Sequence, residues 1–130
     1  MSIEAFISGE PYCQDKTKGN VLGKQDWSQA IIAATKDLPK ITSRCKAEIT
    51  FVLPLNKYPT DHPYGSDLDN LLKRLFDALN ETVFSVAAGK DGAVVEVIAS
   101  KRKASENDPP GAHIKIQEID NIKTDYAKTD

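Results

Sequence analysis

The chain has 130 residues, of which 40% are hydrophobic and 28% are charged, and its 17 Lys and Arg against 19 Asp and Glu give a formal net charge of -2. This composition is typical of one soluble globular domain and excludes collagen-like and wholly disordered chains. The near-neutral charge by itself gives no sign of the strongly basic face expected of a nucleic-acid binder.

The apolar runs are too short for a membrane helix. The longest of them, 30–34 and 51–55, fall far below the ~18 residues that a span requires. Residues 1–10 contain acids and no basic stretch, so they do not form a secretory signal. We therefore expect a cytoplasmic protein with no membrane partner. Cys13 and Cys45 are widely spaced and lack a metal-binding pattern, so reduced thiols are expected.

The first half of the chain predicts a strand, a helix and a second strand. Residues 3–8 mix apolar and small side chains before a Gly-Glu-Pro break, which suits a short strand. An apolar stripe at helical spacing then predicts a helix over about Asp26–Asp37, with Asp26 as its N-cap. Residues 47–55 alternate, which predicts a half-buried strand, and a proline-rich extended loop follows.

The second half predicts one strong helix and two strands. Six apolar residues recur at helical spacing between Asp67 and about Glu81, giving the most amphipathic segment of the chain. Gly89 and Gly92 bracket a turn before an alternating strand at 93–102. Residues 108–111 make a second turn, and 112–119 alternate as an edge-type strand with one face in water.

These elements predict a two-layer α/β (α+β) domain in which two helices cover a small mixed sheet, in the order β-α-β-α-β-β. The domain is expected to span residues 1–119. Residues 120–130 are polar and aperiodic, which indicates a flexible C-terminal tail.

Several carboxylates stand at the ends of the predicted elements. Asp67 and Asp69 lie at the start of the second helix with Lys73 one turn further on, and Asp91 lies in the turn before the third strand. Carboxylates in such places suit Mg²⁺, which takes one or two of them and keeps waters and phosphate oxygens. The same residues also suit a capping box, an i, i+4 ion pair and an ordinary turn, so the local pattern leaves both interpretations open.

A longer pattern favours the metal site. The run DLDNLLKRLFDALN at 67–80, followed by KDGAVVEV at 90–97, resembles the signature of the RusA-type Holliday junction resolvases. In that family a D-x-D-N-L-x-K-x-x-x-D-A-L helix precedes a D-D-x-Q-V turn and strand. The clear similarity covers Asp67 to about Lys103, and Ser8–Pro11 with Trp27 looks like the N-terminal half of the family.

The resemblance implies a homodimeric endonuclease that binds four-way DNA junctions and nicks two strands symmetrically with Mg²⁺, which Mn²⁺ can replace, in phage or prophage recombination and repair. By the same resemblance, Asp67, Asp69 and Asp91 match the metal-binding positions and Lys73 matches a lysine needed for activity. Basic residues outside the motif are then candidate contacts to the DNA backbone: Lys16, Lys18, Lys24, Lys57, Lys101, Arg102 and Lys103.

The chain departs from the family pattern at several positions. Ser66 replaces a basic residue, the paired acids of the turn become Lys90 and Asp91, and Ala93 replaces a glutamine. The change at position 90 leaves one turn carboxylate instead of two. This reduced acidity supports a second hypothesis, a junction-binding module that has lost catalysis. A third is a small α/β protein whose acids only cap a helix.

Overall fold

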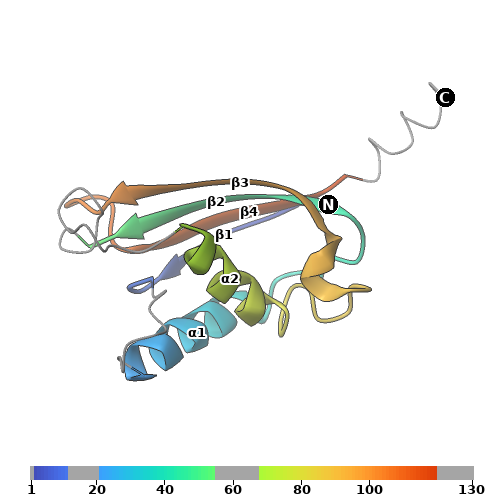
Figure 1. Ribbon diagram of the computed structural model, residues 1–130, viewed down its shortest axis with the longest axis horizontal. Helices are drawn as coiled ribbons and strands as arrows, with labels where there is room; N and C mark the ends of the chain where they lie inside the picture. Colours follow the sequence, from blue (N-terminus) through green and yellow to red (C-terminus); the bar gives the residue numbers. More distant parts are fainter. Residues whose placement is uncertain (1, 12–20, 55–67, 120–130) are drawn as a thin grey trace.

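The computed structural model describes residues 2–11, 21–54 and 68–119, with side chains in the second range described from residue 26 (Figure 1). Its elements are, in chain order, β1 (Ser2–Ser8), α1 (Val21–Thr35), β2 (Cys45–Leu53), α2 (Leu68–Leu79), the short 3-10 helix η2 (Lys90–Ala93), β3 (Val94–Lys103) and β4 (Gly111–Glu118). The predicted order of strands and helices is confirmed, and η2 occupies the predicted turn. The loop at 55–67 and the predicted tail at 120–130 lie outside the described residues.

The four strands form one mixed sheet in the order β1-β4-β2-β3. β4 is antiparallel to both β1 and β2, whereas β2 and β3 run parallel. The prediction that β4 is an edge strand is therefore wrong. The alternation of β4 arises because one face of the sheet is open to water. A local pattern cannot show that β4 has β2 on one side and β1, the first strand of the chain, on the other.

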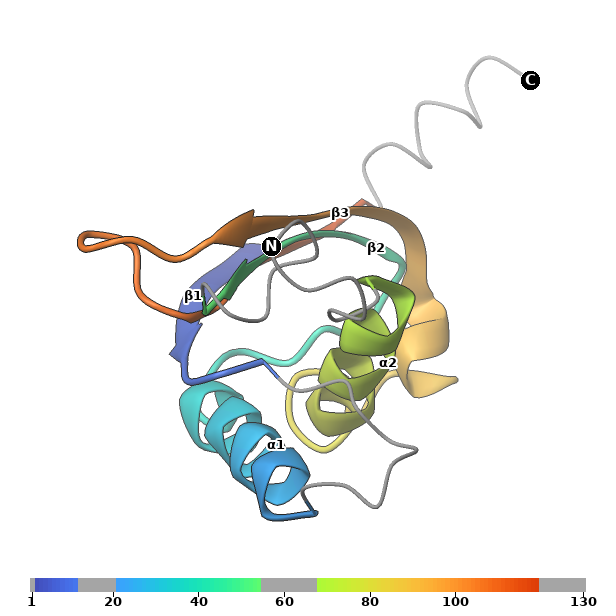
Figure 2. The same ribbon diagram turned by 60° about the vertical axis from the view of Figure 1, so that its left-hand side comes forward.

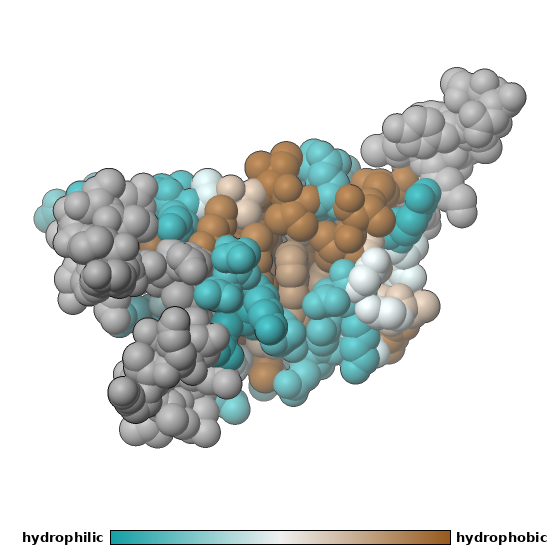
Figure 3. Space-filling view, viewed as in Figure 1, coloured by the Kyte–Doolittle hydropathy of each residue, from teal (hydrophilic) through white to brown (hydrophobic). Residues whose placement is uncertain are grey.

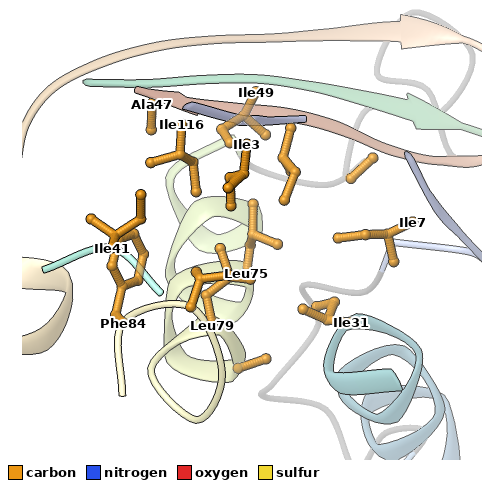
Figure 4. Packing of buried hydrophobic residues seen from close by; sticks show 14 of the residues in the cluster. Ile3, Ile7, Ile31, Ile41, Ala47, Ile49, Leu75, Leu79, Phe84 and Ile116 are labelled. Carbon is orange, nitrogen blue, oxygen red and sulfur yellow. The ribbon is translucent and has the colours of Figure 1, made fainter. Parts of the chain in front are cut away.

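Both helices pack on the same face of the sheet, which gives the predicted two layers (Figures 1 and 2). Ile49 and Phe51 of β2 point toward them, and Figure 4 shows Leu75 and Leu79 of α2 directed into the space beneath the strands. These side chains are 0 to 2% exposed, as the apolar stripes predict. Burial of each such side chain contributes about 1.5–3 kcal/mol, so this interface fixes where α2 lies.

α1 begins earlier than predicted. It starts at Val21, so Asp26 lies inside the helix and is not its N-cap. Gly23 does not prevent the extension, because a glycine costs only about 1 kcal/mol in a helix interior and each added residue gains a backbone hydrogen bond. At the other end Thr35 is buried, and its hydroxyl lies 2.7 Å from the Ile31 carbonyl and 2.8 Å from the Thr82 hydroxyl. This contact ties α1 to the segment after α2.

β2 and α2 end earlier than predicted. β2 ends at Leu53 because Pro54 has no N–H to offer a ladder. α2 ends at Leu79, and the chain then turns back so that the Ile41 amide donates to the Val83 carbonyl. No helix within the described ranges is long and apolar enough to cross a membrane.

Candidate active site

The first turns of α2 present two of the predicted site residues to solvent. Asp69 lies in the first turn and Lys73 follows one turn later, and both side chains are exposed. Residues four apart share one face of a helix, while Leu71 and Leu75 bury the opposite face. Unpaired backbone N–H groups at a helix N-terminus favour a negative charge such as that of Asp69. In the part of the chain that the structure describes, no ion pair joins Asp69 to Lys73.

Asp67 directly precedes the first residue of α2 and lies outside the described residues. The structure therefore places one of the two predicted helix-start carboxylates. The sequence spacing of two residues remains the basis for treating them as a pair.

Asp91 is held in η2 by the side chain of Asn80. The Asp91 backbone N–H donates to Asn80 Oδ1 at 2.9 Å, and Asn80 Nδ2 donates to Asp91 Oδ2 at 3.3 Å. Gly89 and Lys90, with φ of 75° and 51°, turn the chain into this contact. Asn80 follows the last residue of α2, so Asp91 is anchored at the C-terminal end of that helix.

Asp69 and Asp91 therefore lie at opposite ends of α2. Eleven residues separate Asp69 from Asn80, which at 1.5 Å per residue corresponds to about 16 Å along the helix axis. Two oxygens that share one Mg²⁺ at 2.0–2.1 Å are at most about 4 Å apart. Within one protomer, the carboxylates of Asp69 and Asp91 do not reach the same ion.

The basic end of β3 is partly neutralised by the turn that follows it. Arg102 donates from Nε to Asp108 Oδ2 at 2.6 Å and from Nη2 to Asp108 Oδ1 at 2.8 Å. These bonds lower the pKa of Asp108 and raise that of Arg102. His113 lies beside the pair, with Nε2 3.3 Å from Arg102 Nη2. The Arg102 guanidinium is thus bound by the Asp108 carboxylate. The sequence, in which residues 101–103 form a basic run, does not predict this contact.

The other predicted DNA contacts are placed only in part. Lys101 and Lys103 flank Arg102 on β3, and both make contacts within the protein. Lys24 belongs to α1, and its side chain is not described. Lys16, Lys18 and Lys57 lie outside the described ranges.

The donor set at α2 suits a hard divalent cation, because carboxylate oxygens are the ligands that Mg²⁺ and Ca²⁺ prefer. Across residues 2–11, 26–54 and 68–119, no three His, Cys, Asp or Glu side chains gather closely enough to hold a metal ion. This finding does not include Asp67, which lies two residues before Asp69 and outside the described residues.

Comparison with known protein families shows which family this chain belongs to. The family described as endodeoxyribonuclease RusA matches residues 23–117, which are 95 of the 130 residues. The chain belongs to the RusA endodeoxyribonuclease family. No curated protein matches the chain. RusA enzymes are endodeoxyribonucleases, hydrolases that act on DNA and resolve Holliday junctions, and they generally depend on a divalent metal.

The RusA match runs from α1 to β4 and contains Asp69, Lys73 and Asp91. It also contains Asn80, whose contact with Asp91 the sequence did not predict. The partners are eleven residues apart, and Asn80 follows α2 whereas Asp91 lies in η2, so no helix or strand periodicity relates them. The available signal was the residue type, since an Asn amide at a helix end can bond both a backbone N–H and a carboxylate.

Proposed function

We propose that this protein is a Mg²⁺-dependent homodimeric endonuclease that resolves four-way DNA junctions by paired symmetric nicks. The observation that carries the proposal is the exposed pair Asp69 and Lys73 at the N-terminal end of α2, inside the RusA match. A phosphodiester on a large branched DNA can reach these side chains only because they lie at the surface.

The two carboxylates at the start of α2 and Lys73 have distinct roles in this proposal. Asp67 and Asp69 hold the metal through carboxylate oxygens. Lys73 offers an ammonium to the scissile phosphate or the leaving oxygen from one helical turn away. When bound, the metal supplies an activated water and stabilises the negative charge that builds on the phosphate.

Asp91 enters the proposal through the dimer. Because it is anchored to Asn80 at the far end of α2, it can join an ion at Asp67 and Asp69 only when a second protomer presents it. Two-fold symmetry would then build two equivalent sites and account for paired nicks.

DNA contacts in this proposal come from the basic side chains outside α2. Lys101 and Lys103 stand at the end of β3, and Lys16, Lys18, Lys24 and Lys57 add charge from the rest of the chain. Arg102 contributes less because Asp108 already binds it. Since such contacts release counterions, junction affinity is expected to fall steeply as salt rises.

Replacing Asp69 tests the metal assignment. Asp69→Asn should still bind a labelled four-way junction while nicking in Mg²⁺ disappears. Asp77→Asn is the matched control, since Asp77 is an exposed aspartate on the same helix, two turns away. Undiminished nicking by Asp69→Asn would remove that carboxylate from the mechanism.

Mixing two inactive variants tests the role of Asp91. Asp69→Asn and Asp91→Asn should each lose nicking, and mixed dimers should regain one intact site that cuts a single strand. Normal nicking by Asp91→Asn alone would exclude it from the site. Inactivity of the mixture would contradict a site shared between protomers.

A junction-binding protein without catalysis is the second candidate. Lys90 stands where the family has an acid, and the one carboxylate of the turn is engaged by Asn80. Incubation of the unmodified protein with labelled junction and Mg²⁺ or Mn²⁺ separates the two functions, because binding without product would favour this candidate.

A further inference from the structure

The outer edge of β3 exposes apolar side chains that its sheet does not cover. β3 is an edge strand with β2 as its only neighbour in the described sheet. Val95, Val97 and Ile98 are 52%, 40% and 51% exposed. A long apolar edge strand offers unpaired backbone groups to another chain, and proteins normally protect such edges with charges, prolines or bulges.

The apolar residues occupy one half of β3 and the basic residues occupy the other. Val97 and Ala99 share the helix-covered face, because they pair in register with the buried Ala47 and Ile49 of β2, whereas Val95 lies at the register shift just before them. Ile98 lies on the open face. Lys101, Arg102 and Lys103 form the other end. Figure 3 shows hydrophobic residues gathered along the rim where β3 runs in Figure 1.

We propose that a second copy of this chain covers this edge, with the two β3 strands pairing antiparallel about a two-fold axis at Val97. The inference rests on the homodimer of the proposed function and names its surface. Opposite residues of an antiparallel pair point to the same face of the sheet. A two-fold axis normal to the sheet therefore passes midway between one residue and its own copy on the partner strand. With the axis at Val97, Val95 faces the partner's Ala99 and Val97 faces its own copy.

Charge and orientation favour a second copy as the occupant. On the helix-covered face this register gives a strip of apolar residues made of Val97 and Ala99 from each copy. The two copies of Lys101 then lie eight residues apart along the pair, about 27 Å, which exceeds the Debye length of ~8–10 Å and removes their repulsion. The axis also keeps both α2 helices on one side of an eight-stranded sheet, so both Asp69 side chains can face one junction.

Sedimentation without DNA or metal tests the surface. The unmodified protein should sediment as a dimer at micromolar concentration, and the double variant Val97→Lys, Ile98→Lys should sediment as a monomer. Val86→Lys is the matched control, because Val86 is 62% exposed and lies outside β3. Circular dichroism should show unchanged secondary structure, since both replaced side chains already contact water.

Cysteine cross-linking tests the register independently of that variant. Val97→Cys should form an intermolecular disulfide under mild oxidation, because copies at the axis lie within the 4.4–6.8 Å Cα separation that a disulfide needs. Val95→Cys should not, since its copy lies about 13 Å away along the strands. The unmodified protein controls for its native cysteines.

Three results would overturn the inference: a monomeric unmodified protein, a dimer that survives the double lysine variant, or cross-linking at position 95 in place of 97. None of them depends on nicking. Asp69→Asn should remain dimeric, so a failure of the metal assignment is distinguishable from a failure of the surface.

Discussion

Asn80 binds Asp91 through both halves of its side-chain amide, with the carbonyl oxygen accepting the Asp91 backbone N–H and the amino group donating to the carboxylate. One residue at the end of α2 thereby fixes the turn that leads into β3. Its carbonyl fixes the backbone of the turn, and its amino group fixes the carboxylate direction. The two bonds can be separated by substitution.

Asn80→Ala removes both bonds and should lower the free energy of unfolding by about 1–3 kcal/mol, because the half-buried Asp91 amide loses its acceptor. Asn80→Asp keeps an acceptor but places a second carboxylate beside Asp91. It should therefore be destabilised at neutral pH and recover in mild acid, where one of the two carboxylates is protonated. Urea unfolding at two pH values measures both effects, and equal loss at both pH values in Asn80→Asp would contradict the carboxylate contact.

Lys73→Ala should reduce nicking by about 100-fold, the scale of losing one donor that stabilises transition-state charge. Junction affinity should change far less, because one cation among many contributes a small part of backbone binding. Lys115→Ala is the control, since Lys115 is exposed on β4, on the open face of the sheet. Single-turnover nicking with protein in excess separates the two effects, and an equal loss in the control would show a general charge effect.

Gly111→Ala should destabilise the fold by about 3 kcal/mol. A Cβ there would meet the Ile7 carbonyl oxygen and come within 2.5 Å of Phe6 Cζ. Gly92→Ala should be close to neutral, because nothing lies within 4 Å of its Cβ position. Thermal unfolding of both variants tests the close packing of β1 on β4, and similar melting temperatures would contradict it.

Asp108→Asn should destabilise the protein at neutral pH and have no effect in strong acid. The Arg102 hydrogen bonds lower the pKa of Asp108 from its usual 3.8. A lowered native pKa gives stability that is fully present above the unfolded value and is lost as pH falls through the native one. Denaturant midpoints at pH 7 and pH 2 should thus differ from those of the unmodified protein only at pH 7. Asp37→Asn, an exposed carboxylate, should match the unmodified protein at both.

Cys45 should resist alkylation in the native protein. Burial, followed by the charge of Glu118, raises the pKa of its thiol to about 11, and the thiolate is the reactive form. Iodoacetamide at pH 8 should modify the peptide containing Cys45 only after denaturant is added, as read by mass spectrometry. Rapid native modification would show that this end of β2 opens.

The sequence alone predicted the elements whose patterns are local. The apolar spacing from Asp67 to about Glu81 predicted α2, because one face of a helix must be buried, and the alternation in 93–102 predicted β3. The same run carried the family resemblance and placed Asp69 and Lys73 on one exposed helical face. These results depend on residues within a few turns of one another, which a linear pattern records.

Only the tertiary structure decided which distant segments meet. It paired β1 with β4, which made the last strand central, and it anchored Asp91 to Asn80 at the far end of α2 from Asp69. It also engaged Arg102 with Asp108 and left the apolar half of β3 exposed. Such contacts depend on the sheet order and on turns that bring distant segments back together, and neither is recorded in the residue spacing of any single segment.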